Sequence, residues 1–149
     1  MCSYCGCESI TVVGRFMREH VEIINAGGAL RRAGESGDAE RVHESVVTLR
    51  GLLGPHAAAE EAGLFAVLAE DEEFTDHVRA LCAEHGTLHD LLDRVDAGSH
   101  SLVPDLEKML RAHIDREENG LFPAAAIAFA GPEWERVVAL TPAEEPVRP

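Results

Sequence analysis

The sequence predicts an all-α protein, an up-down-up-down four-helix bundle followed by a short C-terminal helix. Hydrophobic residues make up 46% of its 149 residues and aromatic residues only 5%. This composition suits close-packed helices better than a sheet, whose strands favour aromatic and β-branched side chains. Apolar residues also recur at helical spacing in four long segments. A ten-residue motif occurs twice, in the second and the fourth of these segments, and indicates two similar helical hairpins.

The first hairpin is expected to begin near Ile10, where apolar residues start to recur every three or four positions. Residues 34–38 contain two glycines and form the expected turn, with Asp38 as a candidate N-cap of the second helix. Gly54-Pro55 interrupts the apolar stripe of that helix just before His56. We therefore expect a kink at this point.

The second hairpin follows an acidic connection at residues 70–73. The third helix has an apolar stripe that starts at Val78, and it is expected to end near Gly98. Residues 99–101 are expected to form a loop. Pro104 suits the first turn of the fourth helix, because the missing N–H of proline has no helical partner there.

The fourth helix is expected to bend or end at Pro123, since proline removes a hydrogen bond from a helix interior. Residues 131–132, a Gly-Pro pair, open one more short helix that extends to about Leu140, with Trp134 as its packing anchor. The chain is thus expected to have three parts. They are a cysteine-rich head (1–9), the bundle (10–130), and a short helix with a flexible tail (131–149).

The charge and hydropathy of the chain exclude several classes of partner. The net charge is −14 and the isoelectric point is about 4.8, so a nucleic acid or an anionic membrane would be repelled. No segment approaches the roughly 20 apolar residues that a membrane span needs, and the N-terminus shows no signal-peptide pattern. We expect a cytoplasmic protein that binds neither nucleic acid nor membrane and is a monomer or weak dimer.

The repeated motif is His-x-x-x-Glu-Glu-x-Gly-Leu-Phe, which begins at His56 and again at His113. A His and a Glu four residues apart lie on one face of a helix, one turn above the other. A second pair of similar dipeptides, Glu19-His20 and Glu84-His85, lies on apolar faces of the first and third helices. Each hairpin therefore supplies one lone histidine and one His-x-x-x-Glu, the kind of arrangement from which helix bundles build dinuclear metal sites.

The inward-facing polar residues indicate bound metal. The candidate ligands on these faces are His20, His56, Glu60, His85, His89, His113 and Glu117. Burying even one unpaired carboxylate costs several kcal/mol, whereas a pair of cations turns carboxylates and neutral imidazoles into ligands. Mixed imidazole and carboxylate ligands suit iron, manganese or zinc. Two bridging carboxylates favour a pair of iron ions joined by an oxo or hydroxo bridge, although zinc would satisfy the same side chains.

The order His, His-x-x-x-Glu, His, His-x-x-x-Glu resembles the hemerythrin-like, or HHE cation-binding, family over roughly residues 10–125. The resemblance implies a four-helix bundle with a non-haem di-iron centre, in which two glutamates bridge the metals and each metal takes two histidines. The implied bridges are Glu60 and Glu117, and the implied histidine pairs are His20 with His56 and His85 with His113.

Two registers stay open within this resemblance. Oxygen-carrying hemerythrins have a His-x-x-x-His on the third helix, and His85 and His89 have that spacing. If His85 instead aligns with the second of those histidines, the first falls at Leu81 and one iron has a more open coordination position. Glu118 competes with Glu117, because oxygen carriers place this carboxylate five residues after the histidine. The duplicated motif favours Glu117.

The resemblance and the open position lead to a functional hypothesis. We expect a non-haem di-iron protein that binds or senses O2, NO or H2O2 in oxidative or nitrosative stress. An enzymatic alternative is a di-iron peroxidase, a catalase-like enzyme or an NO-reducing enzyme, and a third is iron storage or iron–sulfur repair. The expected pocket has no Gly-rich phosphate loop and no further nucleophile, so the sequence gives no support for group transfer.

Four cysteines lie outside this ligand pattern. Cys2, Cys5 and Cys7 form Cys-x-x-Cys-x-Cys, one ligand short of a tetrahedral metal site. Cys82, one turn before His85, is the remaining thiol. We interpret the head as a flexible, reducible thiol cluster and Cys82 as a small core residue. Redox sensing or disulfide formation is the next hypothesis, and a second metal site is the last.

Overall fold

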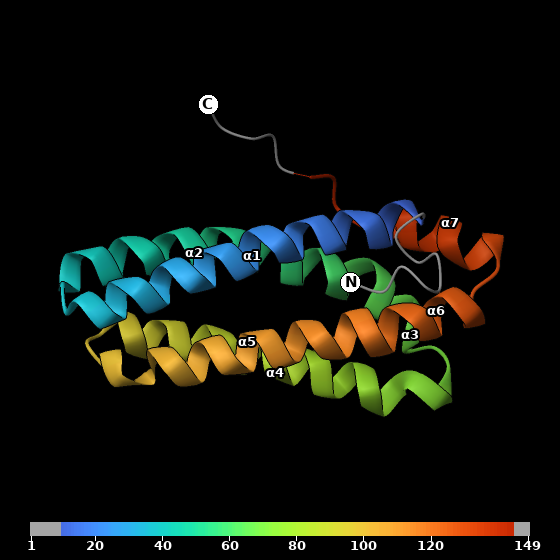
Figure 1. The fold of residues 1–149 in the computed structure, drawn as a ribbon. Coiled ribbons are helices and arrows are strands. Elements are labelled where there is room, and N and C mark those ends of the chain that lie inside the picture. The colour runs from blue at the N-terminus through green and yellow to red at the C-terminus, as the bar shows by residue number, and fades with distance from the viewer. Residues whose placement is uncertain (1–9, 145–149) are drawn as a thin grey trace.

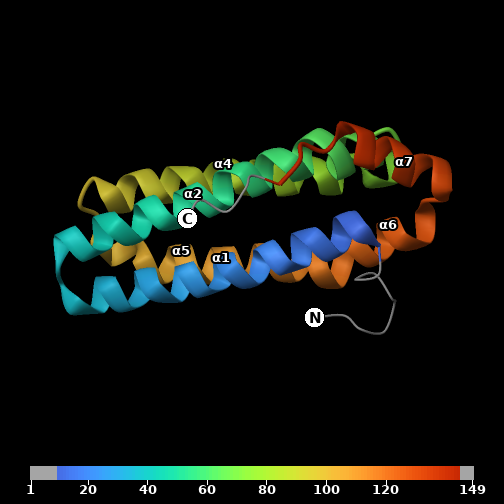
Figure 2. The ribbon, with the colours of Figure 1, turned by 90° about the horizontal axis from the view of Figure 1, so that it is seen from above.

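The computed structural model describes residues 10–144, which form helices and turns without a strand in that range. Its four long helices make two antiparallel hairpins that lie side by side (Figures 1 and 2). Their bounds are α1 (Thr11–Ser36), α2 (Ala39–Glu60), α4 (Glu72–Asp96) and α5 (Val103–Arg116). Each of them packs against two others, α1 against α2 and α5, and α4 against α2 and α5. The expected up-down-up-down bundle is confirmed.

The second and fourth helices continue beyond their α-helical parts through a short π-helical segment. After α2 come η2 (Glu61–Phe65) and α3 (Ala66–Leu68), and after α5 come η4 (Glu117–Leu121) and α6 (Phe122–Ala128). A π-helical turn inserts one residue into a helix and is common at functional sites. The fourth helix does not end at Pro123, because helical structure continues from η4 into α6, whose first turn contains that residue.

The turns agree with the sequence in most places. The Asp38 side chain caps α2 by accepting hydrogen bonds from the backbone N–H groups of Glu40 and Arg41. The preceding Gly37 has a φ of 71°, in the left-handed region that glycine tolerates best. The expected loop at residues 99–101 is wrong, because a 3₁₀ turn, η3 (His100–Leu102), leads directly into α5. Such tight turns often precede an α-helix.

The Gly54-Pro55 pair, where a kink is expected, does not break α2, which remains α-helical through Pro55. Pro55 and Gly51, one turn before it, are exposed. Proline has no N–H to donate to the carbonyl of Gly51, and because this carbonyl is near the surface, water can bond to it instead. The hydrogen-bonding pattern of the helix changes only at Glu61, directly after the expected ligand Glu60.

The buried apolar side chains form two clusters rather than one. The first joins the start of α1 to η2, α6 and α7 (Gly131–Leu140), and includes Phe16, Leu81 and Phe122. The second occupies the other half of the bundle and includes Ile23, Leu53 and Leu88. On each of the four long helical segments the change from one cluster to the other falls at the expected metal ligands. The polar residues thus form a single layer between two apolar cores.

The C-terminal helix α7 packs against η2 as a fifth helical element (Figure 1). Val137 is fully buried there, and Trp134, the expected packing anchor, contacts the ring of Phe129 edge-on at 5.2 Å between centroids. Residues 1–9, which hold the expected cysteine head, lie outside the described residues, as do residues 145–149 of the expected tail. No helix in residues 10–144 is long and apolar enough to cross a bilayer.

The close approach of α7 to η2 depends on Gly63. A Cβ atom at this position would lie 2.1 Å from Thr141 Oγ1 and 3.0 Å from the Val137 carbonyl oxygen. We expect Gly63→Ala to destabilise the protein by about 1–3 kcal/mol, the usual cost of overpacking. Gly51→Ala is the matched control, because nothing lies within 4 Å of a Cβ there, and it should stabilise α2 by about 0.5–1 kcal/mol. Thermal unfolding of both variants measures these changes. An unchanged stability of Gly63→Ala would contradict this account.

Candidate metal centre

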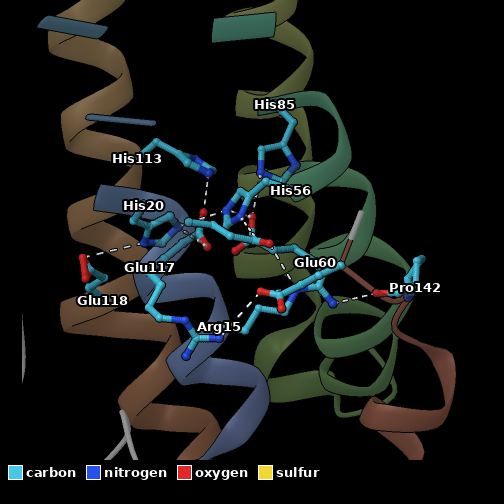
Figure 3. A network of polar contacts seen from close by, with 12 residues as sticks. Arg15, His20, His56, Glu60, His85, His113, Glu117, Glu118 and Pro142 are labelled. Carbon is cyan, nitrogen blue, oxygen red and sulfur yellow. Dashed lines mark hydrogen bonds and ion pairs between the residues drawn. The ribbon is translucent and has the colours of Figure 1, made fainter. Parts of the chain in front are cut away.

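Six of the seven expected ligands meet in the polar layer between the two apolar cores (Figure 3). They come from all four long helical segments, and each is at most 3% exposed. The six residues are His20, His56, Glu60, His85, His113 and Glu117. These are the only buried polar or charged residues in the described range, so the polar character of the interior is confined to this layer.

The four imidazoles direct their Nε2 atoms toward the two carboxylates. Glu60 Oε1 lies 3.1 Å from Nε2 of His56 and 3.3 Å from Nε2 of His85. Glu117 is in contact with Nε2 of His113 through Oε1, and its Oε2 lies 3.8 Å from Nε2 of His20. Each glutamate therefore reaches one histidine from its own helix and one from the other hairpin.

The six residues form two groups with ligand atoms within 4.8 Å of one another. One contains His20 and His56, the other contains His85 and His113, and both contain Glu60 and Glu117. Two histidines for each metal and two shared glutamates is the arrangement that the family resemblance implies. The two histidine pairs in the structure are the same pairs that the resemblance implies.

His89 and Glu118 lie outside both groups. His89 is half-buried one turn beyond His85, on the side of the second apolar core. Leu81, one turn before His85, is fully buried in the first core, so no histidine flanks His85 as a second inward ligand. Glu118 faces the outer nitrogen of His20, with 3.7 Å between its Oε2 and Nδ1. The geometry thus favours Glu117 over Glu118 as the inward carboxylate.

The site fits a pair of cations because most of its buried polar atoms have no hydrogen-bond partner of suitable geometry within the described chain. Both oxygens of Glu60 and both of Glu117 lack a hydrogen-bond donor of suitable geometry within the described chain, as do Nε2 of His85 and Nε2 of His113. The Nε2 atoms of His20 and His56 face each other at 3.1 Å, where at most one can carry a proton. Unpaired buried acceptors of this kind are costly unless a cation binds them.

A carboxylate faces the outer nitrogen of every histidine. The Nδ1–H of His56 donates to Glu19 at 2.8 Å, and the Nδ1–H of His113 donates to Glu84 at 2.6 Å. Nδ1 of His20 lies 3.7 Å from Glu118, and Nδ1 of His85 lies 3.7 Å from Glu61. A carboxylate that accepts a hydrogen bond in this position fixes the tautomer and orientation of a metal-binding imidazole and raises its basicity, as Glu19 and Glu84 do, whereas Glu118 and Glu61 lie beyond hydrogen-bond distance. The four carboxylates explain why the sequence carries Glu19-His20, Glu84-His85 and the two Glu-Glu pairs.

The six side chains of the layer differ in protonation. Burial opposes the charge of Glu60, but the adjacent His56 outweighs burial and holds the pKa of Glu60 well below its usual range. Burial also opposes the charge of His56, yet Glu60 and the hydrogen bond to Glu19 raise its pKa to about 9. For His113, burial prevails over the hydrogen bond to Glu84 and lowers the pKa. At neutral pH, His56 is therefore the protonated, cationic imidazole, while His113 is the neutral form.

The end of each repeated motif supports a histidine of the other hairpin. The ring of Phe65 stacks on His85 and the ring of Phe122 stacks on His20, both with 5.8 Å between centroids. Leu64 and Leu121 are fully buried beside them. These residues and Met17 form the apolar walls of the layer on the side of the first core. The π-helical segments after Glu60 and at Glu117 were not expected from the sequence, since an apolar stripe does not reveal one inserted residue.

Cys82 is half-buried and packs against the first apolar core. Burial, followed by the neighbouring Glu61, raises the pKa of its thiol to about 12. A thiol with so little thiolate at neutral pH is a poor metal ligand and a poor nucleophile. Its role as a small core residue is supported, while Cys2, Cys5 and Cys7 lie outside the described residues.

Comparison with protein families gives one match. The family model described as the hemerythrin HHE cation binding domain matches residues 11–125. That range begins at the first residue of α1 and ends within α6, so it contains all six clustered residues. No match was found among curated proteins or among solved structures.

Replacing Glu117 should affect metal content far more than replacing its neighbour. Glu117 belongs to both ligand groups, so Glu117→Ala should lose at least one of two bound metal ions. Glu118→Ala removes only a carboxylate that faces the outer side of His20 and should retain both ions, with affinity reduced by roughly 10–100-fold at most. Metal analysis after gel filtration distinguishes the two variants. Equal losses would contradict the assignment of Glu117.

Metal binding should release the proton of His56, because an imidazole binds metal through a deprotonated nitrogen. With a pKa of about 9 in the metal-free protein, the apparent affinity should rise about tenfold per pH unit up to that pH. The same proton stabilises the metal-free fold. Its contribution is fully present below about pH 6.5 and is lost as the pH rises through about 9. Calorimetry of Zn²⁺ binding in two buffers of different ionisation enthalpy counts the released protons, and zero would contradict this assignment.

Proposed function

Because the chain belongs to the hemerythrin HHE cation-binding family, we propose that it is a non-haem di-iron protein that binds or senses O2, NO or peroxide in oxidative or nitrosative stress. The observation that carries the proposal is the pair of ligand groups that share Glu60 and Glu117. A ferrous pair held in this way supplies electrons to a small ligand.

Charge favours iron over zinc as the occupant. Glu60 and Glu117 are buried, and four more carboxylates, those of Glu19, Glu61, Glu84 and Glu118, face the outer nitrogens of the histidines. Arg15 and Arg116 offset the charge of Glu19 and Glu84, so the carboxylates of Glu60, Glu61, Glu117 and Glu118 carry the argument. Two cations that can reach a trivalent state offset this negative charge better than two that remain divalent. Mixed imidazole and carboxylate ligands suit iron in both oxidation states.

The first apolar core would restrict access to small ligands. A five-histidine oxygen carrier has an additional imidazole on the third helix, and neither Leu81 nor His89 supplies one to the two ligand groups here, so one metal position has fewer protein ligands. Phe65 and Phe122 cover two histidines with their ring faces, and Leu64 is fully buried beside them. These walls shield the layer from water on the side of the first apolar core and leave it suited to diatomic or peroxidic ligands rather than to large substrates.

The missing imidazole on the third helix also favours a second candidate, in which the protein turns over peroxide or reduces NO. Fewer protein ligands leave a coordination position where a substrate can exchange. The layer itself contains no hydroxyl or thiol side chain among its six buried polar residues. Proton transfer in such an enzyme would therefore involve the outer carboxylates, of which Glu19 and Glu84 have hydrogen bonds to histidines.

The test starts from anaerobic protein loaded with Fe²⁺. We expect two iron ions per chain, and near-ultraviolet charge-transfer bands typical of a bridged ferric pair after exposure to O2. Glu60→Ala serves as the metal-deficient control. Stopped-flow mixing with O2, NO or H2O2 should give a stoichiometric reaction if the protein is a sensor and steady-state consumption if it is an enzyme. Protein that accepts only zinc, or iron that reacts with none of the three, would contradict the proposal.

A further inference from the structure

The two histidines of the His-x-x-x-Glu motifs are each held by a chain of two hydrogen-bonded residues. On one side, Arg15 Nε donates to Glu19 Oε2 at 3.1 Å, and Glu19 Oε1 accepts from His56 Nδ1 at 2.8 Å. On the other side, Arg116 Nη2 lies 2.7 Å from Glu84 Oε1, and Glu84 Oε2 accepts from His113 Nδ1 at 2.6 Å. Each glutamate uses one oxygen for the arginine and the other for the histidine. We call these the Arg15 relay and the Arg116 relay.

The two relays differ in what holds the arginine. Arg15 Nη1 also donates to the backbone carbonyl of Pro142 at 2.6 Å (Figure 3). Glu144 lies 3.7 Å from Arg15 and 3.6 Å from Arg18. The Arg15 side chain is only 14% exposed, whereas that of Arg116 is 46% exposed. Within residues 10–144, Arg116 forms an ion pair with Glu84 alone.

The segment that reaches Arg15 begins at a fixed point. Thr141 is placed by the packing of α7 on η2, with its backbone N–H and its hydroxyl both donating to the Val137 carbonyl. From there the chain crosses toward α1, and residues 142–144 line one side of a groove of about 1160 Å³ between α1 and α2. Glu19 and His56 line the same groove. The C-terminal segment therefore connects η2, which follows Glu60, to the Arg15 relay.

We propose that Arg15 is a positioning residue for the metal centre and that residues 142–144 hold it, so that the metal position of His20 and His56 releases its cation more slowly than the position of His85 and His113. A carboxylate that is itself fixed orients its imidazole better than a mobile one, and outer partners of this kind change metal affinity by about 10–100-fold. The segment also restricts access to the groove beside His56. The proposal rests on the two-metal site proposed above but not on iron or on any reaction with a small ligand.

The test uses the full-length protein loaded with two Co²⁺ ions and mixed with excess EDTA. Wild type should release the ions in two phases of equal amplitude. Arg15→Met keeps the apolar part of the side chain and removes its donors, and it should accelerate the slow phase about tenfold or more without changing the fast phase. Arg116→Met is the matched control and should accelerate only the fast phase.

A second variant separates the C-terminal segment from Arg15. A chain that ends after Thr141 keeps the contact with Gly63 and loses Pro142 and Glu144. It should accelerate the slow phase as Arg15→Met does. In the NMR spectrum of the Co²⁺-loaded protein, solvent exchange of the His56 Nδ1–H should become faster and that of His113 should not. A general loss of stability would speed the exchange of both imidazole protons, so a change at His56 alone indicates a local effect. Circular dichroism of each variant monitors overall stability.

Two results would overturn the proposal. One is a single release rate for both ions in wild type. The other is a slow phase that neither Arg15→Met nor the truncation accelerates. Protein that binds two Co²⁺ ions with these kinetics but whose iron form ignores O2, NO and H2O2 would contradict the proposed function alone. Protein that binds no divalent cation would overturn both.

Discussion

The structure depends on the cost of placing four imidazoles and two carboxylates at one level inside a helical bundle. Both glutamates are fully buried, and their four oxygens lack hydrogen-bond donors within the described chain. Bound cations would stabilise such a layer, because they bind the carboxylates and imidazoles directly. The free energy of metal binding would then add to the free energy of folding. The apolar cores on either side, the stacked phenylalanines and the outer carboxylates all serve to hold the six side chains around that charge.

The duplication in the sequence extends to the outer contacts of the centre. Phe65 on His85 corresponds to Phe122 on His20, and the bond from His56 to Glu19 corresponds to that from His113 to Glu84. The second glutamate of each motif faces the lone histidine of the other hairpin. Each hairpin therefore completes the site of its partner, which explains why the repeat extends beyond the ligands to Leu-Phe.

Much of this arrangement could be predicted from the sequence, because each inward ligand replaces an apolar residue at helical spacing. Periodicity placed His20, His56 and His85 correctly, but it also included His89, which has the same spacing and lies outside the cluster. It gave no sign of the π-helical segments, since one inserted residue does not change which residues are apolar. The contact between Arg15 and Pro142 joins residues far apart in the chain, and only the packing of α7 on η2 brings them together.

The separation of the interior into two apolar clusters has a consequence for unfolding. Helices of 26, 22 and 25 residues extend through both clusters, but the side chains of one cluster do not interlock with those of the other across the polar layer. Local opening follows such boundaries. The half that contains the turns at residues 37 and 98 and the half that contains α7 can therefore exchange amide hydrogens as two separate foldons, and occupation of the layer by cations would merge them into one cooperative unit.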